Sequence, residues 1–426
     1  MSLSSVTSSD DAVASDSQGR RLGSRELIGL IALLMALNAA AIDVFIPALQ
    51  DIGAALGVED VNRRQWVISA YLLGFAVAQL FYGTLSDRFG RRPVLFVGLS
   101  IYVLGALAAV FAPTFGVLLA LRAVEGVGAA ATRVIAVSVV RDCFEGRRMA
   151  SVMSLVMMVF LAMPVVAPSL GSAILVMGTW QELSAVVCLV GIIAFVWAWR
   201  RLPETLAVEN RRPLEPQRVL EAFRQVLTTR VSAGYMLASA TIFGALFGFV
   251  NQAEQVYTQV YDLGPAFTLY FSIAALCMAG ASFANSRLVG RFGMRRLSHM
   301  ALVTFAVLSA VHLFLIEVTG GALPLWAFTI LMSVTFGMIG FVGTNFNALA
   351  MDPLGRIAGT ASSVLGAVQM LGGGLFGAAI GYAYDGTLEP LLIGFLALSL
   401  VSLGFTLVAE RGRLFDRVHK PALSVP

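Results

Sequence analysis

Charged residues are scarce in this chain, and so are residues that bind metals or cross-link the backbone. Lys, Arg, Asp and Glu make up 13% of its 426 residues, about half the share of a soluble domain, which excludes that class. The three cysteines lie far apart with no CxxC pair, so neither a disulfide framework nor a zinc site is expected. The three histidines are scattered too, and we expect no metal and no cofactor.

Patterns for ATP binding and catalysis are missing as well. The chain has no GxxxxGK[ST] loop, which argues against ATP-driven work by this chain alone. No nucleophile stands in a recognisable pattern with a base, so we do not expect an enzyme. The net charge of +4 is spread over separate loops and forms no basic stripe, which argues against a nucleic-acid partner.

Long apolar runs dominate what is present. Hydrophobic residues make up 58% of the chain, and its mean hydropathy is +0.83. A hydrocarbon core about 30 Å thick needs about 20 apolar residues in a helix, and runs of that length recur throughout. The sequence therefore predicts an all-α membrane protein with twelve transmembrane helices in two six-helix bundles. The predicted spans are residues 27–49, 66–86, 93–112, 115–140, 150–176, 183–199, 232–257, 266–286, 297–317, 324–349, 358–384 and 390–409.

Polar segments divide the chain into parts. The first residues are rich in Ser and Asp and too poor in apolar side chains to fold, so we predict a disordered cytoplasmic tail. The longest polar stretch separates the sixth and seventh predicted spans. The predicted parts are the tail 1–25, an N-terminal bundle 26–199, a cytoplasmic linker 200–231, a C-terminal bundle 232–410 and a cytoplasmic tail 411–426.

The basic residues predict the orientation. All but four of the 29 Lys and Arg residues lie in the two tails or in the loops on the same side as the tails. The exceptions are Arg63 and Arg64 in an opposite loop, and Arg122 and Arg133 within the fourth predicted span. Because short cytoplasmic loops retain Lys and Arg, we predict that both termini are cytoplasmic.

The two halves share a short repeat. RFGRR at 88–92 follows the second predicted span, and RFGMR at 291–295 follows the eighth. This indicates an internal duplication. Parallel repeats of this kind form secondary transporters in which the substrate site lies near the bilayer midplane.

The repeat belongs to a longer motif, GTLSDRFGRRP at 83–93. It resembles the signature of the major facilitator superfamily. The Asp carboxylate can accept hydrogen bonds from arginines or from a helix N-terminus, as a cytoplasmic gate needs. The alternative is a tight basic turn that only orients the protein. The predicted gate residues are Gly83, Asp87, Arg88, Gly90, Arg91 and Arg92.

Two further motifs narrow the family. LALRAVEGVGAAA at 119–131 resembles the fourth-helix motif of drug/proton antiporters, with Arg122 in the arginine position and Glu125 where that family usually has Gln. PVVAPSLGS at 164–172 resembles the fifth-helix antiporter motif, although a kink without a transport role is the alternative. The predicted residues of this second motif are Pro164, Pro168 and Gly171.

With IDVFIPAL at 42–49, VVRDCFEGRR at 139–148 and GRIAGTASSVLGAVQMLGG at 355–373, the resemblance covers nearly the whole chain. It is closest to the bicyclomycin-resistance (Bcr/CflA) branch. The resemblance implies a monomeric, proton-coupled antiporter that exports small drug-like or antibiotic molecules across the bacterial inner membrane. The substrate itself does not follow from the motifs. A proton-coupled importer or metabolite symporter on the same fold is the alternative.

Asp43 is the acid of the first predicted span. At 1.5 Å per residue it lies about 24 Å from the cytoplasmic face and Arg122 about 20 Å, so the two can share a level. An unpaired charge there costs about 2.5–3.5 kcal/mol, which favours a partner or a polar cavity. Burial favours a neutral carboxyl and a nearby guanidinium favours an ionised one, so the site can couple to protons. A fixed ion pair between two helices is the alternative.

Glu125 follows Arg122 by three residues, the spacing that places two side chains on one helix face. It either neutralises Arg122 or provides a second site for a proton or cation, and both alternatives stay open. The predicted proton-coupling residues are Asp43, Arg122 and Glu125.

Polar side chains in other spans complete the predicted substrate site. Hydrogen bonds that only join helices are the alternative for each of them. The predicted substrate-binding residues are Asn38, Asp43, Tyr71, Arg122, Asn251, Gln252, Glu254, Asn345 and Gln369, with Asn347 as a further cavity residue.

Overall fold

The computed structural model describes most of the chain. The predicted tails fall largely outside the described residues, so the disorder of the N-terminal tail stays a prediction except as noted below. The described residues are 12–15, 21–144, 146–211 and 216–415.

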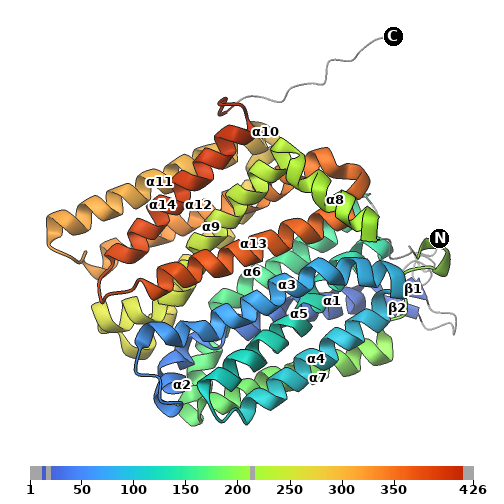
Figure 1. The fold of residues 1–426 in the computed structure, drawn as a ribbon, viewed down its shortest axis with the longest axis horizontal. Helices are drawn as coiled ribbons and strands as arrows, with labels where there is room; N and C mark the ends of the chain where they lie inside the picture. The colour runs from blue at the N-terminus through green and yellow to red at the C-terminus, as the bar shows by residue number, and fades with distance from the viewer. Residues whose placement is uncertain (1–11, 16–20, 145, 212–215, 416–426) are drawn as a thin grey trace, which may run out of the picture. The chain divides into compact units, whose positions relative to one another are not determined.

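Long helices account for nearly all of this structure (Figure 1). Within the described part, eleven helices are long and apolar enough to cross a membrane, and α6 contributes the shorter apolar segment Val165–Met177. Every predicted span coincides with a long helix, which confirms the all-α membrane fold. The long helices are α1 (Ser24–Asp43), α3 (Trp66–Phe89), α4 (Arg91–Val110), α5 (Phe115–Cys143), α6 (Gly146–Met177), α7 (Trp180–Arg201), α9 (Arg230–Gln255), α10 (Phe267–Phe292), α11 (Met294–Thr319), α12 (Leu325–Met351), α13 (Ala358–Tyr382) and α14 (Glu389–Ala409).

Short elements connect the long helices. The first predicted span ends early, because α1 stops at Asp43 and the chain turns through η1, where Pro47 cannot donate to a continuing helix. A short antiparallel strand pair lies within the stretch predicted as a disordered tail, so that prediction is wrong for the paired residues. The short elements are β1 (Ala12–Ser15), β2 (Arg21–Gly23), η1 (Ile46–Ala48), α2 (Leu49–Ala55), η2 (Val61–Gln65), η3 (Val208–Asn210), α8 (Pro216–Thr228), the π-helical η4 (Val256–Val260), η5 (Gly264–Ala266) and η6 (Asp352–Ile357).

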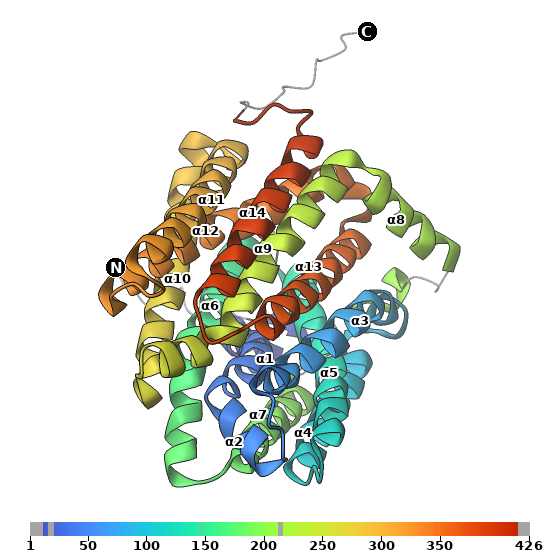
Figure 2. The same cartoon turned by 60° about the vertical axis from the view of Figure 1, so that its left-hand side comes forward.

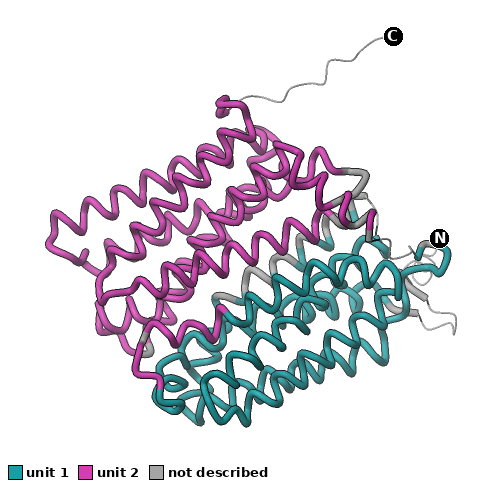
Figure 3. Tube along the Cα trace, in the orientation of Figure 1, with its two compact units in different colours: residues 1–57, 70–216 teal, residues 58–69, 217–426 magenta. Residues whose placement is uncertain are grey.

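The helices form two compact units (Figure 3). Unit 1 comprises residues 1–57 and 70–216, and unit 2 comprises residues 58–69 and 217–426. The predicted bundle boundaries therefore need one correction, because residues 58–69 belong to the second unit.

Hydrogen bonds explain this assignment. The Asn62 amide donates to the carbonyls of Tyr382 and Tyr384 at the end of α13, at 3.0 and 2.8 Å. Gln65 donates to the Gln255 side chain at 2.6 Å. These contacts join residues far apart in the sequence, which is why a division by polar stretches missed them.

Helix packing repeats between the two units. In unit 1, α1 packs on α6, and α4 packs on α5 and α7. In unit 2, α9 packs on α13, and α11 packs on α12 and α14. Since these helices occupy equivalent places in the two halves, the packing supports the internal duplication predicted from RFGRR and RFGMR. Gly90 and Gly293 of the repeat also share an extended backbone with positive φ, 100° and 84°.

Glycines bring α5 close to its neighbours in unit 1. A Cβ added to Gly126 would overlap the Tyr71 carbonyl oxygen of α3, and one added to Gly128 would overlap the Tyr102 backbone of α4. Small residues at such crossings allow membrane helices to pack backbone against backbone. The GVGAAA part of the fourth-helix motif thus serves close packing, and it positions Arg122 one turn away.

Candidate functional site

Three helices of unit 1 bring the predicted coupling residues and Tyr71, a predicted substrate-binding residue, into one buried region. Arg122 and Glu125 lie on α5, Asp43 is the last residue of α1, and Tyr71 lies on α3. The exposed fractions are 0% for Arg122, 1% for Glu125 and 5% for Asp43. Charged side chains buried this deeply need partners or a functional reason to be there.

Arg122 is held from several sides. One terminal nitrogen of its guanidinium pairs with Glu125 Oε2 at 2.8 Å, and the other donates to the Ala41 carbonyl at 2.6 Å. The guanidinium carbon also lies over the rings of Phe45 and Tyr71, 4.2 and 4.7 Å from their centroids. Such cation–π contacts contribute about 0.5–2 kcal/mol each. Arg122 is therefore anchored to both α1 and α3.

This geometry supports the first of the two alternatives for Glu125, because Glu125 does pair with Arg122. The geometry is also compatible with the second alternative, in which Glu125 provides a further site for a proton or cation. Glu125 Oε1 is buried and has no hydrogen-bond partner in the described part of the chain. A carboxylate with one oxygen bound and one oxygen unused can still accept a proton or a donor from a ligand.

Asp43 is buried near the residue of α1 that binds Arg122. It follows Ala41, the residue that accepts the Arg122 hydrogen bond, by two positions. The Tyr71 hydroxyl donates to Asn38 Oδ1 at 2.9 Å, so Asn38, one turn earlier on α1, is also tied to α3. Four of the predicted polar residues of unit 1 thus belong to one connected region, which is centred on Arg122.

The fifth-helix motif meets the same part of α1. Pro164, Pro168 and Gly171 all lie within α6. A Cβ added to Gly171 would overlap the Val44 carbonyl oxygen, directly after Asp43. The motif glycine therefore permits α6 to contact the backbone where α1 ends.

The polar residues predicted in unit 2 form separate contacts. Asn345 donates to Asn285 Oδ1 at 2.7 Å. Gln369 donates to the Ser239 hydroxyl and, at 3.1 Å, to Asn347. These bonds join different helices, as the alternative role of structural hydrogen bonding requires.

The remaining predicted residues of unit 2 lie on α9. Gln252 donates to the Ile380 carbonyl at 2.6 Å. Asn251 is fully buried, and neither polar atom of its side chain has a hydrogen-bond partner among the described residues. Glu254 accepts from the Thr258 hydroxyl, through its backbone carbonyl at 2.7 Å and its side chain at 3.3 Å. Asn251 is thus the residue of this group with the most unused hydrogen-bonding capacity.

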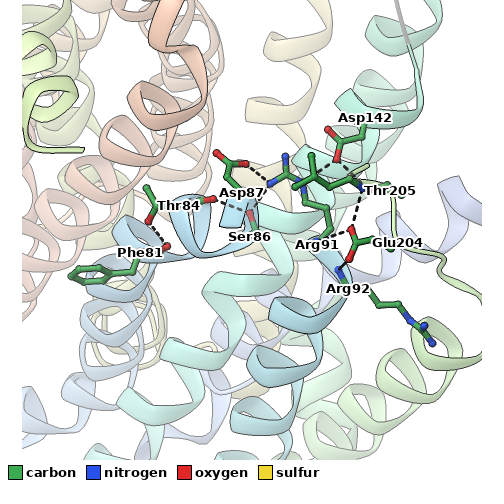
Figure 4. Close-up of polar contacts among 11 residues, drawn as sticks. Phe81, Thr84, Ser86, Asp87, Arg91, Arg92, Asp142, Glu204 and Thr205 are labelled. Carbon is green, nitrogen blue, oxygen red and sulfur yellow. Dashed lines mark hydrogen bonds and ion pairs between the residues drawn. The ribbon is translucent and has the colours of Figure 1, made fainter. Parts of the chain in front are cut away.

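Residues 83–93 form a dense ionic cluster in unit 1 (Figure 4). Arg91 pairs with Asp87 at 2.5 Å and with Asp142, at the end of α5, at 2.9 Å. It also donates to the Ser86 hydroxyl at 2.7 Å. Arg88 is exposed. Of the predicted gate residues, Asp87 and Arg91 are thus directly bonded to each other.

Glu204, which sequence reasoning missed, completes this cluster. Its carboxylate accepts from the backbone amides of Arg91 and Arg92 at 2.9 and 3.2 Å. It thereby caps the N-terminus of α4, where negative charge is stabilising. Asp142 could have been found, because it lies in VVRDCFEGRR. No local signal marks Glu204.

Unit 2 holds a related cluster. Glu410, directly after α14, accepts from Arg295 at 2.7 Å and from the Tyr235 hydroxyl at 2.6 Å. The same Tyr235 hydroxyl also forms a hydrogen bond with His299 Nε2 at 2.9 Å. Burial opposes ionisation of Glu410, but the hydrogen bonds from Tyr235 and Arg295 outweigh it and lower the pKa of Glu410. In both units, then, a carboxylate that follows the last long helix (α7 or α14) binds the start of the third long helix of that unit (α4 or α11).

Comparison with known proteins defines the class. A model of the Major Facilitator Superfamily matches residues 30–377. The chain therefore belongs to this superfamily, and the resemblance found in its motifs is confirmed. It is a multi-pass membrane protein of a family of transporters.

Relatives and solved structures agree with this assignment. The chain is 30% identical over 373 residues to the bicyclomycin resistance protein homolog of Haemophilus influenzae, covering 87% of this chain and 93% of that protein. It is 29% identical over 351 residues to multidrug resistance protein D of Escherichia coli, covering 82% and 86%. A solved D-xylose-proton symporter has a TM-score of 0.70 at 14% identity, covering 92% of this chain and 97% of that one. At such identity the likeness shows the fold alone.

Proposed function

We propose that this protein is a proton-coupled antiporter that exports small drug-like molecules across the bacterial inner membrane. The names of its relatives, bicyclomycin and multidrug resistance proteins, support export of drugs. The observation that carries the proposal is the buried group of Asp43, Arg122 and Glu125 in unit 1. The proton gradient supplies the energy, with no cofactor, and the working unit is a monomer.

The charges of this group suit proton exchange. Two carboxyl groups, those of Asp43 and Glu125, share the region with one guanidinium. When both are ionised, a buried negative charge is left over, which a proton or a positively polarised substrate can neutralise. Binding of one then disfavours the other, and that competition is what an antiporter needs.

The pairing of Arg122 with Glu125 supports different roles for the two acids. Glu125 already has an ionic partner, so its charge is balanced within α5. Asp43 is therefore the first candidate for the exchanged proton. Glu125, with Oε1 unused, is the candidate for ligand contact or for a second proton.

Asymmetry of Lys and Arg supports cytoplasmic termini. Protons then enter from the opposite side, protonate Asp43 and release the substrate outward. Loss of the proton to the cytoplasm restores the site. An importer would carry protons and substrate in the same direction.

Drug accumulation in everted membrane vesicles tests the proposal. Asp43→Asn should abolish uphill, proton-driven accumulation and leave equilibrium binding measurable, because an amide keeps the shape but cannot exchange the proton. Glu317→Gln, an exposed carboxyl of α11, is the matched control and should transport normally.

The double variant Asp43→Asn, Glu125→Gln tests whether one acid can carry the proton when the other is lost. Full proton-driven accumulation by this variant would refute the coupling site. Full activity of Asp43→Asn together with loss of activity in Glu125→Gln would assign the exchanged proton to Glu125 on α5. A substrate-driven proton flux of the opposite sign would indicate symport.

A further inference from the structure

Helix α8 (Pro216–Thr228) is an amphipathic helix that does not cross the membrane. It lies between the last span of unit 1 and the first span of unit 2, within the stretch predicted as a plain linker. Its apolar residues recur at helical spacing, and the most separated exposed pair, Leu220 and Leu227, are two turns apart. Its 13 residues are too few for a span and include charged side chains.

Only part of its apolar face is covered by protein. Val226 is buried, with 1% of its surface exposed. Leu220 and Leu227 are exposed to 70% and 55%, and Phe223 is half-buried. Two large aliphatic side chains on one side of a short helix are thus left mostly uncovered by protein. Because α8 is not a span, the hydrocarbon core around a span does not account for them.

The direction of α8 fits a helix that lies along a membrane surface. Thr229 has an extended backbone and separates α8 from α9, which begins at Arg230. Figures 1 and 2 both show α8 running crosswise to α9 and α14 of the same unit. A helix that runs across the ends of spans lies along the plane of the bilayer, at the level of the headgroups.

The polar residues around this face fit a lipid surface. Arg224 is exposed, four residues after Leu220 and three before Leu227, so it borders the two leucines on the helix. Glu221 and Gln225 are exposed on the side away from them. An arginine next to an inserted apolar face can reach lipid phosphates, as in amphipathic helices that lie in the interface.

We propose that α8 lies in the headgroup layer of the cytoplasmic leaflet and binds anionic phospholipid. Leu220 and Leu227 insert below the headgroups, and Arg224 binds their phosphates. The wider stretch 200–230 carries seven Arg against four Glu, which adds attraction to a negative surface. The choice of leaflet rests on the cytoplasmic orientation that belongs to the proposed function.

Fluorescence quenching of the full chain in vesicles tests this proposal. Cys143, Cys188 and Cys277 are first replaced by Ala. An environment-sensitive fluorophore is then attached to one new cysteine at a time, Leu220→Cys or Leu227→Cys. Glu221→Cys and Gln225→Cys are the matched controls on the opposite side of the same helix. The vesicles contain phosphatidylcholine alone or mixed with phosphatidylglycerol.

We expect labels at 220 and 227 to be quenched by lipids that carry a nitroxide near the headgroup, and labels at 221 and 225 to be quenched by aqueous iodide. Arg224→Gln should lower the ratio of inserted to exposed label about five-fold in phosphatidylglycerol vesicles, the equivalent of about 1 kcal/mol per arginine. The same change should have little effect in phosphatidylcholine alone.

Equal access of iodide to all four positions would overturn the proposal, because Leu220 and Leu227 would then lie in water. Protection from both iodide and the nitroxide lipids would also overturn it, because a protein would then cover this face. If the labels insert equally well with and without phosphatidylglycerol, the proposed binding of anionic phospholipid is wrong. Because quenching is independent of export, a protein that inserts α8 and does not transport drugs would refute the proposed function alone.

Discussion

Removal of the Glu125 carboxylate should strongly destabilise unit 1. The change leaves the Arg122 guanidinium, which is 0% exposed, without the partner that it binds at 2.8 Å. Breaking a buried ion pair in this way costs about 3–5 kcal/mol. The Ala41 carbonyl and the ring contacts with Phe45 and Tyr71 remain, so we expect Glu125→Leu to lie near the lower limit, at about 3 kcal/mol.

A double-mutant cycle separates this effect from simple loss of packing. Replacing the whole pair, with Arg122→Met and Glu125→Leu together, leaves neither member of the pair as an unpartnered buried charge and should cost less than the two single changes added. Their interaction energy should be about 2–3 kcal/mol, measured from the free energy of unfolding in mixed detergent micelles. Additive effects, within about 0.5 kcal/mol, would show that the pair carries no coupling and would refute the reasoning.

Three further predictions follow from single contacts. Gly126→Ala should lower the free energy of unfolding by about 1–3 kcal/mol, because its Cβ would overlap the Tyr71 carbonyl oxygen, whereas Gly116→Ala meets nothing within 4 Å and is the control. Glu410→Gln should cost about 1.5–3 kcal/mol at neutral pH. Since the folded-state pKa of Glu410 is lowered from 4.5, that cost should shrink as the pH of the unfolding assay falls below about 4.5 and the wild type loses the same charge, and a constant cost would contradict this. Asp87→Ala should change the accessibility of introduced cytoplasmic cysteines more than substrate affinity, and weaker equilibrium binding with unchanged accessibility would contradict a gate role.

Local patterns predicted the helices well, because a membrane span is a local property. About 20 apolar residues in a row form a helix in lipid whatever lies around them, since every backbone group must be satisfied within the segment. The same holds for Arg122 and Glu125, whose spacing of three residues on one helix was enough to predict that they can meet. The exact end of α1 at Asp43 was missed, because a proline four residues later decides it.

Long-range contacts could not be predicted in this way. Glu204 caps a helix that begins 113 residues earlier, and Asn62 binds a carbonyl 320 residues away. A polar residue in a loop has the same local sequence whether or not such a partner exists. The exposure of Leu220 and Leu227 on α8 could not be predicted from the sequence either. Periodicity marks an apolar face, and only packing shows which part of that face stays exposed.

The sequence by itself determined that this is a membrane protein of two related halves, with the transport motifs of its superfamily, and it predicted the acids and the arginine proposed to couple to protons. Hydrophobic length, charge asymmetry and residue spacing carry that information along the chain. Only the tertiary structure decided that Arg122 also binds the Ala41 carbonyl of α1, that residues 58–69 join the second unit, and that Glu204 and Glu410 bind the starts of α4 and α11. Those contacts depend on which helices come within about 3 Å of each other, and that follows from close packing at small residues such as Gly126 and Gly171, not from any local pattern.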